Sequence, residues 1–540
     1  MSAKCNALVC LGTGCQSGGA EEVLSSLKEE IDRLSLGETV QVKQTGCHGF
    51  CQRGPLVVIE PEGIFYSKVS LDDVSEIAKS LLPGEPPVDR LFYREPATDT
   101  PLPHYMEIPF YSKQQRTILR NCGHIDPEEI EEYLAAGGYQ TIKKVLLGMS
   151  REEVIDEIKR SGLRGLGGAG FPTGRKWEVC YKAQGPKKYV ICNGDEGDPG
   201  AFQDRSVMEG TPHSVLEGMM IAAYAIGAQQ GYIYVRAEYP LAVKRLRIAI
   251  SQAKQKGFLG KDILGSGFDF KIALFQGAGA FVCGEETALI ASVEGFRGMP
   301  RLRPPFPAES GMEGKPTIID NVKTLASIPV IIDQGAESFA RVGTEKSKGT
   351  VVFALTGKVE NNGLIEVPMG MTLREIIFDI GGGIPDGKTF KAVQTGGPSG
   401  GCLPESALDM PVDFDSLKAA GSMMGSGGLV VMDEDTCMVD LARYFLDFTQ
   451  RESCGQCTPC RLGTKQLFDI LNDITKGQGR PEDIDLLLEI SEAVSTHSLC
   501  ALGKTAPNPV ITTIRYFRDE YEAHINEKRC PTGVCGMLET

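Results

Sequence analysis

Residues 165–177 read Gly-Leu-Gly-Gly-Ala-Gly-Phe-Pro-Thr-Gly-Arg-Lys-Trp, with five glycines in the first ten positions. Glycine lets the backbone N–H groups of a loop approach a phosphate closely and adopt turns that other residues rarely adopt. Lys176 adds a positive charge at the end of this loop. Because ordinary tight turns are also rich in glycine, the neighbouring segments decide what the loop indicates.

Two further segments favour a binding site in an α/β domain. Residues 193–200, Asn-Gly-Asp-Glu-Gly-Asp-Pro-Gly, follow the strand-like run 189–192 and carry three acids and an amide in six positions. Residues 277–287, Gly-Ala-Gly-Ala-Phe-Val-Cys-Gly-Glu-Glu-Thr, place glycines before an acidic pair at an expected helix start. A second strand-like run at 231–235 completes the pattern, which predicts a site built from loops at strand ends.

The C-terminal part of the chain becomes helical from residue 436 and carries a cysteine set. Cys454, Cys457 and Cys460 lie in one tight loop, and Cys500 follows 40 positions later. Three thiolates in one loop and a fourth from elsewhere are typical ligands of an iron–sulfur cluster. Because CxxC spacing also suits tetrahedral zinc, the spacing alone leaves both metals open.

The first 90 residues form a second module with cysteines. Short strands are expected at 7–9, 39–44, 56–60 and 64–66, and helices over 17–34 and 69–82. The cysteines lie on loops at strand ends, where two pairs of thiolates can meet at one cluster. These residues are Cys10, Cys15, Cys47 and Cys51.

Together, the segments at 165–177, 193–200 and 277–287 resemble the flavin- and NADH-binding subunit of respiratory complex I and of its soluble relatives. The resemblance covers about residues 115–525, including the spacing of the four C-terminal cysteines, and it implies that these hold a [4Fe–4S] cluster. The N-terminal module resembles thioredoxin-like [2Fe–2S] ferredoxin domains, which implies a [2Fe–2S] cluster on its four cysteines. A fused domain of this kind is similar to the arrangement in soluble hydrogenases and formate dehydrogenases.

The same resemblance implies FMN bound between the glycine loop and the acidic segment, with NADH stacked on the flavin. Since the flavin itself carries out hydride transfer, no catalytic side chain is expected. The implied FMN contacts are Gly165, Gly167, Gly168, Lys176, Asn193, Asp195, Glu196, Gly284, Glu285, Asp320, Asn321 and Thr324. The implied NADH contacts are Phe171, Glu196, Asp198, Glu286, Arg303 and Phe306.

Four positions depart from the pattern of this family. Leu166 replaces an arginine of the glycine loop, and Val179 stands where an aromatic residue often flanks the nucleotide. The paired asparagines of the family appear as Asp320 and Asn321, which questions the Asp320 contact. Asp198 is shorter than the usual glutamate, which is expected to alter nucleotide affinity and leave the chemistry unchanged.

The expected fold is an α/β multidomain chain. Residues 349–432 resemble the β-grasp insert of this family, which is SLBB-like and is expected to act as a scaffold. The expected order is a thioredoxin-like [2Fe–2S] domain at 1–90, a linker at 91–114, a Rossmann-like FMN- and NADH-binding domain at 115–340, the β-grasp domain at 349–432, a helical [4Fe–4S] domain at 436–525 and a tail at 526–540.

The tail adds a third set of soft ligands. His524, Cys530 and Cys535 lie within twelve residues, and Cys437 could be the fourth ligand. Three cysteines and one histidine suit a tetrahedral zinc site. The alternative is that some of them are buried thiols without a metal, because free cysteine packs as a small hydrophobic residue.

Bulk properties restrict the partners. The net charge of −15 argues against nucleic acid, which is bound mainly through Lys and Arg. The chain start lacks the charged-then-apolar form of a secretory signal, and the longest apolar run, about 219–228, is too short for a membrane span. A cytoplasmic location is therefore expected.

The leading hypothesis is an NADH-oxidising or NAD-reducing subunit of a cytoplasmic, multi-subunit [FeFe] hydrogenase. Its expected partners are the hydrogenase catalytic subunit with further iron–sulfur clusters, a small thioredoxin-like [2Fe–2S] subunit, NADH, and ferredoxin through these partners. Two alternatives stay open. One is the same role in an NAD-dependent formate dehydrogenase, and the other is a non-catalytic electron-wiring subunit, supported only by Leu166 and Asp320.

Overall fold

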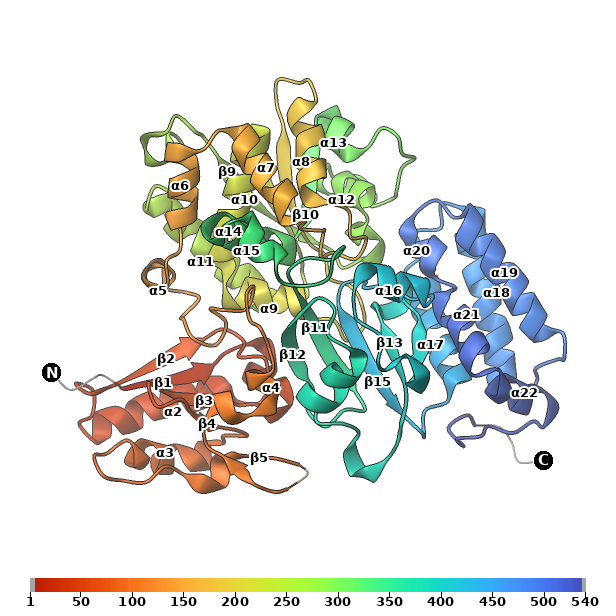
Figure 1. Ribbon diagram of the computed structural model, residues 1–540, viewed down its shortest axis with the longest axis horizontal. Helices are drawn as coiled ribbons and strands as arrows, with labels where there is room; N and C mark the ends of the chain where they lie inside the picture. The colour runs from red at the N-terminus through yellow and green to blue at the C-terminus, as the bar shows by residue number, and fades with distance from the viewer. Residues whose placement is uncertain (1–4, 97, 537–540) are drawn as a thin grey trace.

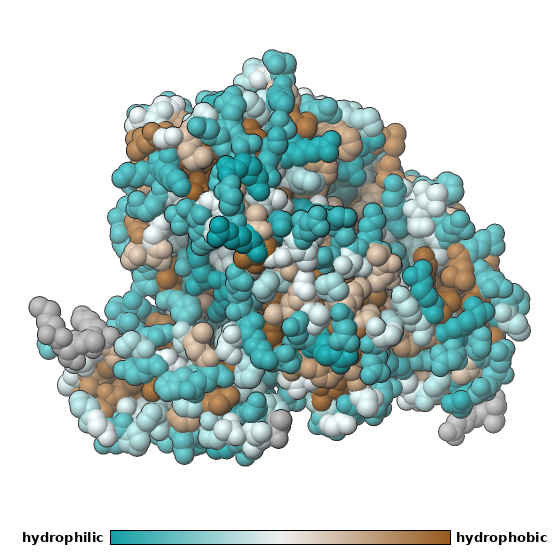
Figure 2. All heavy atoms as spheres, viewed as in Figure 1, coloured by the Kyte–Doolittle hydropathy of each residue, from teal (hydrophilic) through white to brown (hydrophobic). Residues whose placement is uncertain are grey.

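The computed structural model describes residues 5–96 and 98–536 (Figure 1). Residues 1–4 of the expected N-terminal domain and 537–540 of the expected tail lie outside this description. The chain forms four regions in sequence order, coloured from red to blue in Figure 1. Polar residues cover much of the face seen in Figure 2.

The N-terminal region is a four-stranded sheet with helices packed on it. The strand order is β2-β1-β3-β4, with β1 parallel to β2 and antiparallel to β3. The apolar stripe of α2 faces the sheet, as its periodicity predicts. The elements are β1 (Cys5–Cys10), α1 (Thr13–Ser17), α2 (Ala20–Arg33), β2 (Val40–Thr45), β3 (Val57–Glu60), β4 (Ile64–Tyr66) and α3 (Val74–Ser80).

The proline-rich stretch expected to be a linker packs against this region. It contains β5 (Tyr93–Arg94), β6 (Pro101–Leu102) and α4 (Pro109–Ser112). Phe65 donates a backbone hydrogen bond to Pro103 at 2.7 Å, and the ring of Phe110 stacks on Phe50 at 4.0 Å. Burial of its apolar side chains holds the stretch in place, which its proline content did not reveal.

The second region is a four-stranded parallel sheet in the order β10-β7-β8-β9, with helices on its faces. The apolar run at 219–228 belongs to α10, which is buried on nearly all sides in the core. The elements are α5 (Ile130–Ala135), α6 (Gln140–Gly148), α7 (Arg151–Ser161), α8 (Thr173–Lys182), β7 (Tyr189–Gly194), α9 (Gln203–Gly210), α10 (Pro212–Ile226), β8 (Gln230–Arg236), α11 (Pro240–Gln255), β9 (Lys271–Gly277), α12 (Glu286–Val293), α13 (Pro307–Ser310), β10 (Thr317–Asn321), α14 (Val322–Gln334) and α15 (Ala336–Ala340).

The third region is a five-stranded mixed sheet and the fourth is a helical bundle. The sheet has the order β12-β11-β15-β13-β14, and the bundle lies at the blue end of Figure 1. The sheet elements are β11 (Thr350–Gly357), β12 (Gly363–Pro368), β13 (Phe390–Thr395), β14 (Cys402–Pro404), α16 (Phe414–Ala419) and β15 (Gly428–Asp433). The bundle consists of α17 (Met438–Arg451), α18 (Thr458–Thr475), α19 (Asp483–His497), α20 (Ala501–Thr505), α21 (Asn508–Tyr516) and α22 (Arg518–Asn526).

One continuous apolar core joins the first three regions, and the bundle has a core of its own. The N-terminal region meets the parallel-sheet region at Gly46 and Gly210, where a Cβ on Gly46 would lie 2.2 Å from the Gly210 Cα. Thr13 donates from its N–H and its hydroxyl to the buried carboxylate of Glu209, at 3.1 and 2.6 Å. The two regions are therefore docked at a defined position. Across the described ranges, 5–96 and 98–536, helices of sufficient length and apolarity to span a bilayer are absent.

Candidate functional site

The carboxyl ends of β7 and β10 form the centre of the site. These strands are neighbours, and Asn193 pairs in register with Asn321. The next strand along the chain, β8, lies on one side of β7, and the later strand β10 lies on the other side of β7. The strand order therefore reverses at β7. Ligands of open α/β sheets bind in the crevice at such a reversal.

The glycine loop closes over this edge of the sheet. Gly165 donates its backbone N–H to Phe171 at 2.9 Å, and Leu166 donates to the Thr324 hydroxyl at 2.9 Å. A Cβ on Gly167 would lie 3.0 Å from the Asn321 Cβ, and Gly168 has a φ of +121°. The loop thus needs glycine both for its backbone conformation and for its close approach to β10.

Lys176 lies below the loop and pairs with Asp320. Its Nζ is 2.6 Å from the Asp320 carboxylate and 3.8 Å from Glu286. Burial by itself would lower the pKa of Lys176. The negative charges of Asp320 and Glu286 have the larger combined effect and raise this pKa above its ordinary value. The indole of Trp177 donates to Asp320 at 2.8 Å. The departure from the paired asparagines is therefore compensated inside the protein by Lys176 and Trp177.

Asp195 supplies the clearest fit for a flavin. Its carboxylate is buried, and neither oxygen has a hydrogen-bond partner among the described residues. Burial raises its pKa to about 7, against the attraction of Arg236. It faces Gly284, whose carbonyl accepts from the Asn193 amide at 2.9 Å. A buried acceptor beside two glycine-lined loops suits the N–H and hydroxyl groups of FMN.

Glu196 is placed differently from its neighbour. Its two carboxylate oxygens accept from the backbone N–H groups of Asp204 and Arg205 at the start of α9, at 2.9 and 3.0 Å. Burial raises its pKa to about 7. Asp204 in turn accepts from Asn321 at 2.6 Å and from the buried Lys323 at 2.8 Å. Glu196 and Asn321 therefore fix the wall of the site by anchoring the start of α9.

Three of the expected NADH residues, Phe171, Arg303 and Phe306, lie along the outer rim. Phe171 and Phe306 are about half exposed, although they are large apolar side chains. Arg303 lies 3.7 Å from Glu286 and 3.9 Å from Glu285, and its guanidinium sits 6.0 Å from the Phe306 ring centre. Glu285 also caps α12, accepting from Thr287 and Ala288. This rim offers exposed aromatic faces beside charged groups, as a dinucleotide requires.

Asp198 is turned toward the third region. Its carboxylate accepts from the Ser426 hydroxyl, and a Cβ on Gly397 would lie 2.7 Å from it. Burial raises the pKa of Asp198 to about 6. The β-grasp region thus contributes directly to the wall of the site, which sequence reasoning did not foresee.

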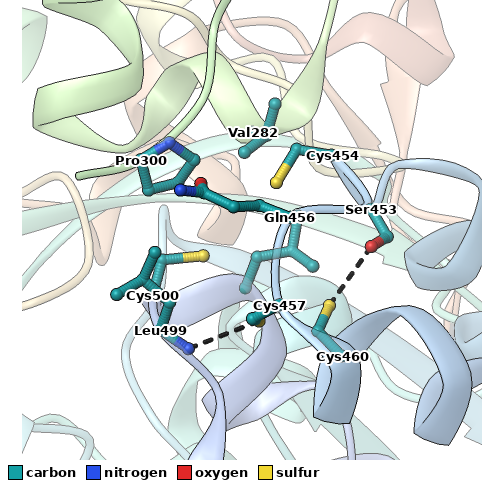
Figure 3. A pocket seen from close by; sticks show the side chains of 10 residues that line it. Val282, Pro300, Ser453, Cys454, Gln456, Cys457, Cys460, Leu499 and Cys500 are labelled. Atoms are coloured by element: carbon teal, nitrogen blue, oxygen red, sulfur yellow. Dashed lines mark hydrogen bonds between the residues drawn. The ribbon is translucent and has the colours of Figure 1, made fainter. Parts of the chain in front are cut away.

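The C-terminal cysteines line one small cavity (Figure 3). Cys454 and Cys457 come from the loop before α18, Cys460 from the first turn of α18, and Cys500 from the residue before α20. The backbone N–H of Leu499 points at the Cys457 sulfur at 3.5 Å, and the Ser453 hydroxyl lies 3.3 Å from the Cys460 sulfur. An apolar cavity with four converging sulfurs fits a [4Fe–4S] cluster.

The flavin edge and this cavity share one short segment. Val282 lines the cysteine cavity, and Gly284, two residues later, faces Asp195. Glu452, just before the cysteine loop, accepts from the Phe281 N–H at 2.8 Å, and Phe448 packs on the Phe281 ring at 5.3 Å. Glu452 is a positioning residue that the sequence analysis missed, because only the fold brings α17 to this loop.

The N-terminal cysteines also converge on one pocket, which all four of them line. The sulfurs of Cys47 and Cys51 are 3.8 Å apart, and the His48 backbone N–H points at the Cys10 sulfur at 3.4 Å. His48 is buried, and its ring nitrogen lies 2.7 Å from the Tyr111 hydroxyl. The cysteine arrangement fits a [2Fe–2S] cluster in a protected pocket.

The third set of soft ligands meets as well. One ligand atom from each of Cys437, His524, Cys530 and Cys535 lies within 4.8 Å of the others. The Cys437 sulfur is 3.5 Å from both the His524 Nε2 and the Cys535 sulfur. For the bond lengths of zinc, the edges of a ligand tetrahedron are about 3.5–3.8 Å. The other His524 nitrogen lies 2.7 Å from the Glu520 carbonyl, which orients the ring as in zinc sites.

Comparison with known families gives four matches in the order of the regions. Residues 2–82 match the thioredoxin-like [2Fe–2S] ferredoxin model, and residues 158–330 match the Nuo51 FMN-binding domain. Residues 352–403 match the SLBB domain, and residues 440–524 match the NADH-ubiquinone oxidoreductase-F iron–sulfur binding region. The predicted fold class and the predicted cofactors, FMN, [4Fe–4S] and [2Fe–2S], are confirmed.

Individual relatives cover most of the chain. The NADP-reducing hydrogenase subunit HndC of Solidesulfovibrio fructosivorans is 60% identical over 428 residues, which are 79% of this chain and 87% of HndC. An NADH-quinone oxidoreductase subunit of Rhizobium meliloti is 46% identical over 77% of this chain and 98% of its own length. A crystal structure of an NAD+-reducing [NiFe]-hydrogenase in the H2-reduced state superimposes with a TM-score of 0.68 and 29% identity, covering 97% of this chain and 85% of that chain.

The chain therefore belongs to the family of FMN- and iron–sulfur-binding subunits found in NADH-quinone oxidoreductases and in related hydrogenases. Within this family it is a flavoprotein subunit that oxidises NADH or NADPH, of the hydrogenase or complex I type.

Proposed function

We propose that this chain exchanges hydride between NADH and FMN and passes the electrons singly to the iron–sulfur clusters of a multi-subunit [FeFe] hydrogenase. Bound FMN would supply the conversion between a two-electron hydride donor and one-electron acceptors. The protein contributes the position, charge and solvent exclusion of the site.

The shared segment at 282–284 is the observation that carries this proposal. Val282 lines the [4Fe–4S] cavity, while Gly284 faces the Asp195 carboxylate at the flavin edge. Two residues of extended chain span at most about 7 Å. The walls of the two sites are therefore adjacent, which favours electron exit from the flavin through the C-terminal cluster.

Named residues take distinct roles in the proposal. The glycine loop and Lys176 would hold the FMN phosphate, and Asp195 and Asn193 would receive its polar groups. Phe171 and Phe306 offer exposed faces for the nicotinamide nucleotide. Arg303 is held beside the rim by Glu285 and Glu286.

We assign the substrate as NADH in preference to NADPH. Two carboxylates, Glu285 and Glu286, lie at the rim, and a 2′-phosphate placed against them would meet like charges. HndC is an NADP-reducing subunit, so the two nucleotides need direct comparison on this chain.

The hydrogenase assignment is supported by the 60% identity to HndC. The [FeFe] type is part of this proposal, and a subunit of an NAD+-reducing [NiFe]-hydrogenase is also similar to this chain, at 29% identity. The proposed partners are a catalytic subunit with further clusters and a small thioredoxin-like [2Fe–2S] subunit, in the cytoplasm. Identification of the subunits that co-purify with this chain distinguishes hydrogenase from formate dehydrogenase.

The test is anaerobic titration of the purified holoprotein with NADH and, separately, with NADPH. NADH is expected to bleach the absorbance of the flavin and then that of the clusters. Reduction by NADPH is expected to be at least about tenfold slower, which corresponds to an activation barrier about 1.4 kcal/mol higher. Equal rates would reject the NADH assignment alone. A flavin that no nicotinamide nucleotide reduces would reject the catalytic function and favour the electron-wiring alternative.

We also propose that Cys437, His524, Cys530 and Cys535 hold one structural zinc ion. Hydrogen bonding from Cys535, together with His524, lowers the Cys437 pKa to about 4 against the effect of burial. Burial alone would lower the His524 pKa, but Cys437 raises it to about 9. Zinc would link α22 and the tail to the start of α17, and its binding would contribute folding free energy there.

A further inference from the structure

A short glycine-rich turn of the third region packs against the flavin site. Residues 425–428 read Gly-Ser-Gly-Gly and lead into β15. Gly427 has a φ of +103°, and its carbonyl accepts from the Ala354 N–H of β11 at 3.0 Å. The Gly428 carbonyl accepts from the Gly396 N–H, also at 3.0 Å. This segment, which we call the serine turn, is therefore fixed by its own sheet.

Ser426 of the serine turn makes two contacts with the parallel-sheet region. Its hydroxyl donates to the Asp198 carboxylate, on the acidic loop that follows β7. Its carbonyl accepts from Lys323 at 3.0 Å, and this buried ammonium is 2.8 Å from Asp204. Asp204 also accepts from Asn321 at the carboxyl end of β10. Ser426 is therefore held by the wall of the site, while its hydroxyl holds Asp198.

The third region, which lies below the parallel-sheet region in Figure 1, also contacts the glycine loop. A Cβ on Gly168 would lie 3.3 Å from the Gly425 carbonyl carbon. Arg164, at the start of the loop, stacks on the Phe414 ring of α16 at 4.3 Å. It also donates to the carbonyl that precedes Phe171, at 2.6 Å. The third region therefore packs against the glycine loop as well as the acidic loop, and each of these loops carries an expected NADH contact.

We propose that Ser426 is a positioning residue for NADH: its hydroxyl fixes the Asp198 carboxylate in the orientation that receives the nucleotide. The inference rests on the proposed function, and it gives the β-grasp region a part in nucleotide binding beyond that of a scaffold. Within the described ranges, Ser426 is the sole hydrogen-bond donor to this carboxylate, and it bonds one of the two oxygens. The other oxygen can accept from the N–H and hydroxyl groups of the nucleotide.

The short side chain of Asp198 makes its orientation important. Aspartate has one methylene fewer than the glutamate expected at this position, so its carboxylate reaches less far from the backbone. A carboxylate that is already fixed loses less conformational freedom when the ligand binds. A Cβ on Gly397 would lie 2.7 Å from this carboxylate, so the third region also limits where it can turn. Ser426 and Gly397 together set its orientation.

Ser426 also affects the ionisation of Asp198. Burial raises the pKa of this carboxyl group to about 6, and the negative charge of Asp204 acts in the same direction. The Ser426 hydroxyl and the positive charge of Lys323 act against them. Removal of the hydroxyl should therefore raise the pKa further, so that Asp198 becomes protonated at a higher pH.

The first test measures the NADH-to-ferricyanide kinetics of the holoprotein after Ser426→Ala. The matched control is Thr389→Ala, which removes a hydroxyl that donates to Glu434 at the other end of the β13–β15 pair. Ser426→Ala is expected to raise KM for NADH about tenfold, equivalent to about 1.4 kcal/mol, with kcat and FMN content nearly unchanged. Ser426→Cys keeps the size of the side chain with a weaker donor, so its KM should be intermediate.

The control variant should keep the wild-type KM. An unchanged KM in Ser426→Ala, or an equal rise in Thr389→Ala, would overturn the proposal. A loss of FMN from Ser426→Ala would show that the serine turn acts on the flavin in place of the nucleotide, and the proposal would again be wrong.

A double-mutant cycle separates positioning from a merely structural role. Asp198→Ala alone should raise KM at least as much as Ser426→Ala does. Adding Ser426→Ala to Asp198→Ala should then change KM little, because the serine has no carboxylate left to orient. Effects that multiply in the double variant would show that Ser426 acts independently of Asp198, which refutes the inference.

The pH dependence of kcat/KM gives a second readout of the same contact. The acidic limb that belongs to Asp198 should move to higher pH in Ser426→Ala, stay in place in Thr389→Ala and be absent in Asp198→Ala. A limb that does not move in Ser426→Ala would contradict the proposal.

The wild-type activity separates this inference from the function on which it rests. If the wild-type holoprotein does not reduce ferricyanide with NADH, the proposed function has failed and the inference fails with it. If the wild type is active and Ser426→Ala keeps its KM and its pH profile, the inference alone has failed.

Discussion

Replacing Lys176 by methionine should separate the structural role of this residue from its role in binding FMN. The Lys176 ammonium lies 2.6 Å from Asp320, whose side chain is only 1% exposed. Removing one partner of a buried ion pair leaves an uncompensated charge and costs about 3–5 kcal/mol. We expect a loss near the lower end, because the Lys176 side chain retains 18% exposure and water can approach.

The double variant Lys176→Met/Asp320→Asn is the decisive control. With neither charge present, most of the lost stability should return, and the asparagine can still accept from the Trp177 indole. FMN content should remain low in both variants, because neither has a cation for the phosphate. The two readouts therefore diverge: stability recovers while flavin binding does not.

The assay uses the single tryptophan of the chain. Trp177 is fully buried beside Asp320, so its fluorescence during urea unfolding reports on this domain. FMN content is measured separately on the flavin released from each purified variant. If the double variant is as unstable as Lys176→Met, or if Lys176→Met retains its full FMN content, the reasoning about this pair is wrong.

Three further outcomes are expected. Cys457→Ser should remove about four irons per chain and stop electron delivery to the partner. NADH should still reduce ferricyanide, because the cluster accepts electrons only after the flavin. Metal analysis that finds zinc lost in place of iron would contradict the assignment of this site to an iron–sulfur cluster. Cys535→Ala should remove about one zinc ion per chain and lower the thermal stability of the helical bundle, with little effect on NADH-to-dye activity. If wild-type protein with its full iron content contains no zinc, the proposed zinc site is wrong. Burial raises the pKa of Asp195 to about 7 in the folded, flavin-free protein, whereas the same carboxyl group in the unfolded chain titrates near pH 4. Between these values the folded protein binds a proton that the unfolded chain has released. The free energy of unfolding should therefore fall as the pH rises from about 4 to 7. Unfolding midpoints measured across this range should be flatter in Asp195→Asn, and an unchanged pH profile would show that Asp195 is not the titrating group.

Local patterns in the sequence were sufficient for the cofactors and the order of the regions. Iron–sulfur ligands are recognisable because a metal demands a fixed number of thiolates within a short reach, and both four-cysteine sets converge as expected. The glycine loop is recognisable for a similar reason, since its backbone must approach β10 and a phosphate. Asn193, Asp195, Asp320 and Asn321 lie at or directly after the carboxyl ends of β7 and β10, while the contacts of all expected site residues with FMN and NADH remain predictions.

Other features have no local pattern. The proline-rich stretch before residue 110 resembles a linker by composition, yet the burial of Phe110 against Phe50 makes it part of the N-terminal region. Likewise, Asp320 stands where the family has an asparagine, so the sequence at this position resembles the family less closely. Only the fold shows that Lys176 and Trp177 balance the charge.

The sequence by itself therefore determined which cofactors the chain carries, because ligand spacing and glycine positions are constraints between residues close in the chain. The tertiary structure decided how the sites are connected. Val282 and Gly284 join the flavin edge to the cluster cavity, Ser426 reaches Asp198 from another region, and Arg297 meets the Cys454 loop across more than 150 residues. Such contacts depend on how separate regions pack, and packing is set by the shape and burial of whole surfaces, which no short stretch of sequence encodes.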